Sequence, residues 1–237
     1  MGNDTRLGCK LIDWTAPAHP NATVLEGRYA RLERLDADRH ADALYQANLL
    51  DTSIWDYMSH GPFSSAATYS EWARTAAVSD DPFYYAIRNL ETGRVEGVAS
   101  YLRIKPEMGA IEVGSIIFTP PLQRTRAATE AMFLMMQWAF NAGYRRYEWK
   151  CDSLNAPSRR AALRFGFGFE GVFRQHMVIK GRNRDTAWFA VIDSEWPALK
   201  TAYETWLDPE NFDVNGQQCS SLSDLTKHVR NAKTGGC

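Results

Sequence analysis

Length, composition and charge already exclude several classes of protein. The chain has 237 residues, and one full domain with short additions fits this length because a domain usually spans ~100–200 residues. Hydrophobic residues make up 45% of the chain, which is enough for a core and excludes a fully disordered protein. Lysine and arginine total 27 and the acidic residues 28, so no overall positive field favours nucleic acid or an anionic membrane as a partner.

The first residues and the cysteines give expectations about location. Residues 1–14 lack the apolar run of a secretory signal, and the longest apolar run, near Ala131–Met136, is too short to span a membrane. We therefore expect a cytoplasmic protein. The four cysteines have no close paired spacing, so the sequence indicates neither a disulfide framework nor a metal site.

The first third of the chain predicts one strand and two helices. The residues before Gly27 show little periodicity and are expected to form an arm laid over the domain. The alternation at 28–35 predicts a strand, after which Asp36 is a suitable N-cap for a helix over 37–50. Large aromatic residues around a Gly-Pro break at 54–63 indicate an aromatic loop or a broken helix. Another helix is expected near 66–79.

The middle of the chain predicts a mixed sheet. Strand patterns at Phe83–Arg88, Val95–Ile104 and Ala110–Phe118 are joined by short segments with Gly or Pro, so these strands should form an antiparallel meander. A largely apolar helix over 127–141 and a strand over 146–151 follow. A strand, a helix and a strand in this order predict a parallel crossover. The expected fold class is therefore α/β with a mixed sheet and helices on both faces.

The last third predicts further elements and then a tail. A helix is expected near 157–165, strands over 169–180 and 186–193, and an amphipathic helical segment over Trp196–Leu207 that packs on the domain. The remaining residues are rich in Gly, Ser, Asn and Lys, which predicts a poorly ordered tail. The expected division is an N-terminal arm at 1–26, a domain at 27–207 and a polar tail at 208–237.

One glycine motif has two interpretations. Residues 166–171 spell GFGFEG, the pattern of a dinucleotide-binding loop. Such a loop must follow a strand and open a helix, because the pyrophosphate binds at the helix N-terminus. Here the glycines follow a predicted helix and precede a strand. We therefore interpret Gly166 as a helix cap followed by a turn.

Two arginines at the start of a predicted helix suggest an anion site. In the segment PPLQRTRAATEA at 120–131, Arg124 and Arg126 lie where the helix dipole disfavours a cation. A bound phosphate would offset that cost, because the guanidinium groups and the free backbone N–H groups of the first turn would converge on it. The alternative is that both side chains extend into water.

The same segment resembles the GNAT superfamily of acyl-CoA N-acyltransferases. The family signature is Q/R-x-x-G-x-G/A between a strand and a helix, and Gln123–Ala128 read QRTRAA, with Arg126 where the family usually has glycine. An E-x-G strand at Glu112–Gly114 also matches the family. The N-x-x-S segment at Asn155–Ser158 and the final stretch at 180–196 are similar to the RimJ/RimL-type branch. The resemblance covers roughly residues 27–207 and implies the GNAT fold, with acetyl-CoA as the cofactor.

The resemblance also implies where the cofactor binds. It would enter between the strands of Ile117 and Trp149, which are splayed in this family. Strand residues that would receive the pantetheine arm are Ile116, Ile117 and Phe118. Residues that would cradle the pyrophosphate are Gln123, Arg124, Thr125, Arg126, Ala127, Ala128 and Thr129. Further contacts with pantetheine, adenosine or phosphate are expected from Asn155, Ser158 and Arg159. By the same analogy, the acceptor side would be formed by Trp55, Asp56, Tyr57 and Phe63. The aromatic residues would form a wall and Asp56 would offer a carboxylate to a cationic amine, and for each aromatic residue packing against the sheet is the alternative.

Amine acetylation sets further chemical requirements. An amine attacks the thioester only as the free base, so a general base is needed. Glu112 is the candidate because it is a carboxylate between apolar residues, two positions before a glycine that could mark a bulge. A solvated carboxylate on the outer face is the alternative. The tyrosine that often serves as the acid in the family is replaced here by Ala162. Cys151 is interpreted as a core residue instead of a nucleophile. Asp152 and Ser153, at the end of the same strand, are secondary candidates for a role in the active site.

These observations predict an N-acetyltransferase that moves an acetyl group from acetyl-CoA to a primary amine by direct attack in a ternary complex. The aromatic loop favours an enclosed pocket and therefore a small-molecule amine. A protein N-terminus is the alternative acceptor, and a non-catalytic acyl-CoA-binding module is the alternative function. No nucleic acid, membrane or metal is expected, and a homodimer is left open.

Overall fold

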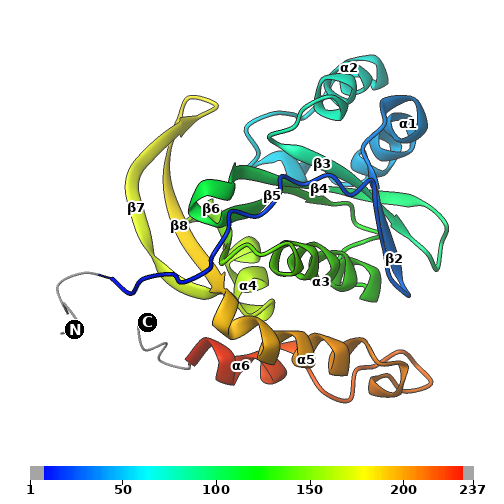
Figure 1. The fold of residues 1–237 in the computed structure, drawn as a ribbon. Helices are drawn as coiled ribbons and strands as arrows, with labels where there is room; N and C mark the ends of the chain where they lie inside the picture. The colour runs from blue at the N-terminus through cyan, green and yellow to red at the C-terminus, as the bar shows by residue number, and fades with distance from the viewer. Residues whose placement is uncertain (1–7, 232–237) are drawn as a thin grey trace, which may run out of the picture.

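A mixed sheet lies between two groups of helices in the computed structural model, which describes residues 8–231 (Figure 1). Its eight strands follow the order β1-β2-β3-β4-β5-β6-β8-β7. They are β1 (Val24–Glu26), β2 (Ala30–Arg34), β3 (Phe83–Asn89), β4 (Val95–Lys105), β5 (Ala110–Phe118), β6 (Arg146–Asp152), β7 (Gly168–Ile179) and β8 (Arg182–Ile192). The antiparallel meander and the parallel crossover from β5 to β6 confirm the predicted fold class.

Helices cover both faces of this sheet. One face carries α1 (Ala37–Asn48) and α2 (Ala66–Ala77), and the other carries α3 (Arg126–Asn141), α4 (Ala156–Arg164), α5 (Trp196–Leu207) and α6 (Leu222–Asn231). Short 3₁₀ turns are η1 (Thr52–Trp55), η2 (Pro106–Met108), η3 (Asp193–Glu195) and η4 (Pro209–Asn211). The side chain of Asp36 caps α1 as predicted, accepting from the backbone N–H groups of Asp38 and Arg39.

Two hydrophobic cores hold these layers together. Between the sheet and α3, the buried residues include Met132, Met135 and Met136, and α5 adds Tyr203, whose ring stacks on Phe133 with the ring centroids 5.2 Å apart. On the other face, the aromatic residues of the 51–63 segment pack with α1 and α2. The sheet is therefore fixed from both sides.

The two parallel strands β5 and β6 separate part-way along their length. They pair only from Ala110–Arg146 to Val113–Trp149. Beyond that point the register between β4 and β5 shifts, and Ser115 takes a left-handed φ of 49°, which marks a bulge next to Gly114. After the bulge, β5 stays with β4 while β6 continues beside β8. The gap between the two strands is where a cleft opens, and the bulge near Gly114 is confirmed.

The prediction of a poorly ordered tail is wrong for the part of it that the structure describes. Helix α6 buries Leu222 completely and leaves Val229 only 5% exposed. Together with Leu225 and Thr226 these residues form an apolar stripe at helical spacing, which the polar composition of the segment concealed. Residues 232–237 lie outside the described residues.

The N-terminal arm also contributes structure. Its residues 24–26 form β1, which pairs antiparallel with β2 at the edge of the sheet. Cys9 is disulfide-bonded, which the spacing of the cysteines does not predict, whereas Cys151 and Cys219 are free thiols. Residues 1–7 of the arm lie outside the described residues.

Candidate active site

A cleft of about 1380 Å³ opens where β5 and β6 separate. Its walls come from the second half of β5, the first turn of α3, the end of β6 and α4. The 51–59 segment and the β7–β8 hairpin close one end of it, and residues 206–218 close the other. All but four of the sequence-predicted cofactor and acceptor residues line this cleft, and the exceptions are described below.

The first turn of α3 provides backbone donors at one end of the cleft. The Thr125 hydroxyl caps the helix by accepting from the N–H of Ala128. The other N–H groups of the first turn have no acceptor within the helix. Gln123, Arg124, Thr125, Arg126, Ala128 and Thr129 line the cleft as predicted. Ala127 does not, because its side chain is buried in the core with 2% exposure.

Two arginines lie on aromatic rings in this region. The guanidinium carbon of Arg126 is 4.9 Å from the ring centre of Tyr29 and 4.7 Å from that of Phe212. Arg164 lies 5.0 Å from the ring centre of Trp206, and its Nη1 donates to the Thr129 hydroxyl at 3.1 Å. Among the described residues, neither arginine has a carboxylate within ion-pair distance. This end of the cleft therefore carries positive charge that no carboxylate among residues 8–231 neutralises.

The start of α4 forms the wall expected for pantetheine. Asn155 caps the helix, with its Oδ1 accepting from the N–H of Ser158 at 3.0 Å. The Ser158 hydroxyl in turn accepts from the indole N–H of Trp149 at 3.0 Å. Asn155 and Ser158 line the cleft as predicted. Arg159 does not, because its guanidinium turns back to donate to the Ser153 carbonyl, and Arg160 lines the cleft instead.

Glu112 lies in the middle of the cleft wall within a network of charges. It is 2% exposed, so the alternative of a solvated carboxylate is wrong. Its Oε1 accepts from Arg103 Nη1 at 2.8 Å, and its Oε2 lies 2.9 Å from Lys150 Nζ. Lys150 also pairs with Glu148 at 2.7 Å and lies over the Trp188 ring. No sequence motif marks this network, because its members come from three different strands.

The electrostatics of Glu112 suit a proton acceptor. Burial raises the pKa of this carboxyl above its ordinary value, and Lys150 and Arg103 offset only part of that rise. A carboxylate with a raised pKa holds an incoming proton better than an exposed one. The role of Glu112 as general base stays a prediction.

The acceptor residues fall into two groups. Asp56 and Tyr57 line the cleft, and the Tyr57 hydroxyl donates to the Leu154 carbonyl. Trp55 and Phe63 do not line it. Their rings pack edge to face with centroids 5.3 Å apart on the α2 side of the sheet, which is the packing alternative stated for them. They support the loop instead of facing the cleft.

The remaining motifs follow their simpler interpretations. Cys151 is buried, and burial raises the pKa of its thiol, which disfavours the nucleophilic thiolate. Ala162 is fully buried in α4. Gly166 has a left-handed φ of 89° just after α4, and its N–H donates to the Leu163 carbonyl, so the interpretation as a helix cap is confirmed.

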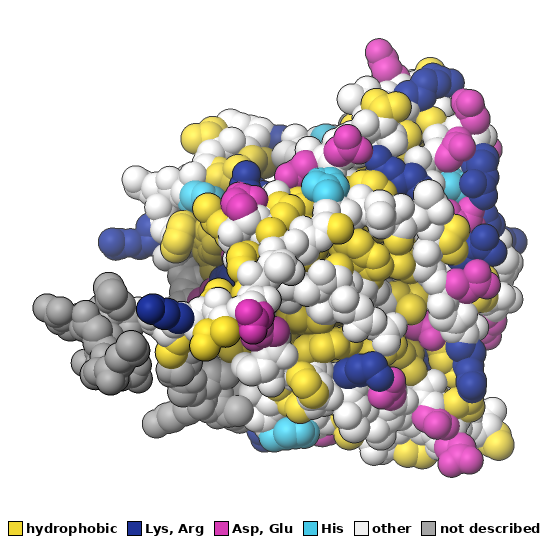
Figure 2. Space-filling model, viewed as in Figure 1, with side chains coloured by type: hydrophobic (Ala, Val, Ile, Leu, Met, Phe, Trp, Pro, Cys, Tyr) yellow, Lys and Arg dark blue, Asp and Glu magenta, His cyan; other side chains and the backbone are white. Residues whose placement is uncertain are grey.

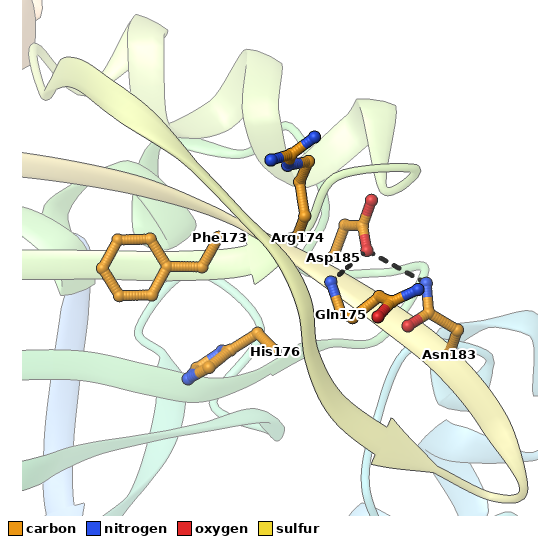
Figure 3. Close-up of a pocket in the computed structure, with 6 residues that line it drawn as sticks. All are labelled: Phe173, Arg174, Gln175, His176, Asn183 and Asp185. Atoms are coloured by element: carbon orange, nitrogen blue, oxygen red, sulfur yellow. Dashed lines mark hydrogen bonds between the residues drawn. The ribbon is translucent and has the colours of Figure 1, made fainter.

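A second hollow of about 710 Å³ lies along the twisted β7–β8 hairpin (Figure 3). Phe173 and His176 lie on one side of the hairpin, while Arg174 and Asp185 lie on the other. The Asp185 carboxylate is occupied, because it accepts from the Gln175 N–H and the Asn183 amide. We therefore place the chemistry in the larger cleft.

Other observations bear on partners. Among the described residues, no cluster of three or more His, Cys, Asp or Glu is arranged to hold a metal ion, and no helix is long and apolar enough to cross a membrane. Lysine and arginine side chains are interspersed with acidic ones on the face shown in Figure 2. The cytoplasmic location stays a prediction.

Comparison with known proteins decides the family. A family model described as "Acetyltransferase (GNAT) domain" matches residues 30–168. The chain belongs to the GNAT family of acetyltransferases. The comparison with curated protein sequences finds no match.

Solved structures of GNAT proteins agree with this assignment. A GCN5-related N-acetyltransferase from Brucella melitensis shares 50% identity over 92% of this chain and 100% of its own, with a TM-score of 0.89. A "probable" GNAT-family acetyltransferase from Chromobacterium violaceum shares 39% identity over 84% of this chain and 100% of its own, with a TM-score of 0.77. A Salmonella typhimurium enzyme that modifies the N-terminal serine of ribosomal protein L7/L12 shares 20% identity over 71% of this chain and 98% of its own. Its TM-score is 0.63, so the likeness shows a common fold only.

Proposed function

We propose that this GNAT protein is an N-acetyltransferase that uses acetyl-CoA as donor and a small primary amine as acceptor. The observation that carries the proposal is that the cleft has two chemically different regions. Positive charge that has no carboxylate partner in the described part of the chain lies at the α3 end, and a buried carboxylate lies at the centre, beside the gap between β5 and β6. The two features suit a phosphate-bearing donor and an amine that must lose a proton.

The residues present fit the donor. Free N–H groups at the start of α3, the small side chain of Ala128 and the nearby guanidinium groups suit a pyrophosphate. Ile116 and Phe118 line the splayed part of β5, where the family resemblance places the pantetheine arm, while Ile117 is also at the wall but is 2% exposed. When bound, acetyl-CoA would supply the acetyl group as a thioester.

Proton transfer is assigned to Glu112. The acceptor arrives as an ammonium ion, and Glu112 accepts its proton directly or through a water molecule. Arg103 and Lys150 hold the carboxylate in place during this step. The free amine then attacks the thioester carbonyl, so that the new C–N bond forms as the C–S bond breaks. The attacking nitrogen gives up its second proton as the amide forms, and the departing thiolate would take up one proton, while Glu112 keeps the first; we assign no residue to this second transfer.

The acceptor end favours a small molecule. Lys180 at the tip of the β7–β8 hairpin donates to the Trp55 carbonyl at 2.9 Å, and Tyr57 reaches Leu154 from the other side. These contacts tie the 51–59 segment to the hairpin and to the β6–α4 turn, which narrows this end of the cleft. Asp56 offers a carboxylate to a cationic amine. A protein N-terminus is the second candidate, supported by the RimJ/RimL-type N-x-x-S segment.

Two measurements test the proposal. Thermal unfolding should show stabilisation by CoA or acetyl-CoA but not by NAD, because a ligand at ~100 times its Kd adds about 2.7 kcal/mol to the native state. Thiol release should then be measured over a broad panel of amines and N-terminal peptides. Binding of CoA without thiol release would favour a non-catalytic acyl-CoA-binding module. The absence of any shift with millimolar CoA would contradict the proposal itself.

A further inference from the structure

The segment after α5 forms one wall of the cleft. We define the C-terminal loop as residues 208–221, between α5 and α6. Phe212, Gly216, Gln217 and Gln218 of this loop line the cleft, as does Trp206 at the end of α5. They lie at the end that holds Arg126 and Arg164. The wall is therefore contributed by a part of the chain that follows the residues matched by the family model.

The C-terminal loop is held in one conformation by its own hydrogen bonds. The Asn211 amide donates to the carbonyls of Trp206 and Ser220, and its Oδ1 accepts from the Ser220 N–H at 2.8 Å. The indole N–H of Trp206 donates to Gln218 Oε1 at 2.7 Å. Because Asn211 is buried and closes the loop at its base, the loop presents Phe212 in a fixed place.

The same wall fixes Arg126. The guanidinium group lies between the rings of Phe212 and Tyr29. Tyr29 is itself held, because its hydroxyl donates to the Leu207 carbonyl and its backbone N–H donates to the buried Glu130 carboxylate. A guanidinium group stacked on aromatic rings keeps the N–H donors at its edge free for a planar partner.

Arg164 is held in a parallel manner. Its guanidinium group lies near the rings of Trp206 and Phe165, and one nitrogen donates to the Thr129 hydroxyl. Its backbone carbonyl accepts from Thr226 of α6, so the C-terminal helix braces this end of α4. Two stacked arginines without carboxylate partners thus face one cleft, and a phosphate group is the anion that accepts such forked donors best.

We propose that Arg126 and Arg164, positioned by Phe212 and Trp206, bind phosphate groups of the nucleotide end of the donor. This inference rests on the proposed function. Arg164 is then a binding residue that the signature loop does not include, and Phe212 is a positioning residue. The bound group is either the pyrophosphate or the 3′-phosphate of the coenzyme.

Substitution of Phe212 tests the positioning role. Phe212→Leu removes the ring but keeps an apolar side chain, and Phe212→Trp keeps a ring. We expect CoA to bind Phe212→Leu about 3–10-fold more weakly, the range of a cation–π contact, while Phe212→Trp stays near the wild type. KM for acetyl-CoA should rise with kcat unchanged. Val214→Ala is the control, because Val214 is fully exposed on the same loop.

Substitution of Arg164 tests the binding role without changing the loop. Arg164→Gln should weaken CoA binding at least tenfold, and the loss should shrink as salt rises. Arg159→Gln is the matched control, because Arg159 lies on the same helix and turns away from the cleft. Titration with dephospho-CoA and with adenosine 3′,5′-bisphosphate then distinguishes the two phosphates. A loss that persists with dephospho-CoA identifies the pyrophosphate, and a loss confined to ligands with a 3′-phosphate identifies that group.

The outcomes separate this inference from the proposed function. If wild-type protein binds CoA while Arg164→Gln and Phe212→Leu bind it equally well, the inference is wrong and the proposed function stands. If the wild type fails to bind CoA, the proposed function fails first. If Phe212→Leu alters the loop, shown by a changed near-ultraviolet spectrum, the Arg164 pair of variants still decides the binding role.

Discussion

The α3 end and the centre of the cleft hold their charges in opposite ways. At the α3 end, Arg126 and Arg164 rest on aromatic rings, and no carboxylate of the described residues lies within ion-pair distance. At the centre, Lys150 and Arg103 both pair with Glu112. Cations with no carboxylate partner among the described residues are available to a ligand anion, whereas paired charges already hold one carboxylate in place. The first arrangement suits binding and the second suits proton transfer.

Removing the central carboxylate should have the largest effect. Glu112→Gln takes away the proton acceptor, so the rate of acetyl transfer should fall by roughly 10²–10⁴-fold while CoA affinity stays nearly the same. Steady-state kinetics and calorimetry measure the two quantities. Glu148→Gln is the control, because Glu148 also pairs with Lys150 but does not line the cleft. A near-normal rate for Glu112→Gln between about pH 6 and pH 9 would remove Glu112 from the mechanism.

Removing the buried cation beside Glu112 should act on both stability and pH dependence. Among residues 8–231, Lys150→Met leaves the buried Glu112 with only Arg103 and the half-buried Glu148 with only Arg146 as ion-pair partner. The unfolding free energy should therefore fall by less than the ~3–5 kcal/mol typical of a buried charge left with no partner. The pKa of Glu112 should rise further, because Lys150 lowers it in the wild type. The acidic limb of the pH–rate profile should therefore move to higher pH. Lys200→Met, at a more exposed pair on α5, should leave both properties unchanged, and an unshifted limb in Lys150→Met would show that another group is titrated.

Arg126, which replaces glycine in the signature loop, tests the α3 end of the cleft. Arg126→Ala should weaken CoA binding by about 1.5–3 kcal/mol, the range of a charge-assisted hydrogen bond, with little change in kcat. The loss should shrink as salt rises, because screening weakens the contact. Dephospho-CoA should show the same loss if the contact is to the pyrophosphate. Equal affinities for CoA in variant and wild type would mean that Arg126 only packs between Tyr29 and Phe212.

Much of the fold could be predicted because its signals are local. Hydrophobic period, helix caps and Gly or Pro between strands lie within a few residues of the elements they specify, as Asp36 and Gly166 show. The tail was mispredicted because composition was used where spacing mattered. Helix α6 is mostly polar, and its few buried residues, Leu222, Thr226 and Val229, are effective only because α4 and α5 lie beneath them.

The site was predictable only where it follows a continuous motif. The loop at 123–129 and the Asn155–Ser158 segment line the cleft, because a motif keeps its residues on one element. Arg164, Phe212 and Lys150 reach the cleft through tertiary packing, so no short spacing marks them. Arg159, which the sequence places at the cofactor, does not line the cleft, whereas Arg160 and Arg164 of the same helix do. A change of one or two positions rotates a helical side chain to another face.

The smallest expected effect concerns a histidine behind the acceptor end. The ring of His60 stacks on Trp72, and burial, with a smaller effect of Lys180, lowers its pKa to about 4. The unfolded chain binds a proton near its ordinary pKa of 6.5 and the folded chain does not, so stability should fall as the pH drops from about 6.5 towards 4. Since the ring is partly exposed, the loss by about pH 5 should be on the order of 1 kcal/mol. Urea unfolding at pH 7 and at pH 5 measures this loss of stability.

His60→Phe keeps the aromatic packing and removes the titrating group, so this variant should lose less stability between these two pH values than the wild type. His228→Gln, at an exposed position on α6, should behave like the wild type. If His60→Phe and the wild type lose the same amount, the neutral histidine contributes nothing to the acid sensitivity, and another group accounts for it.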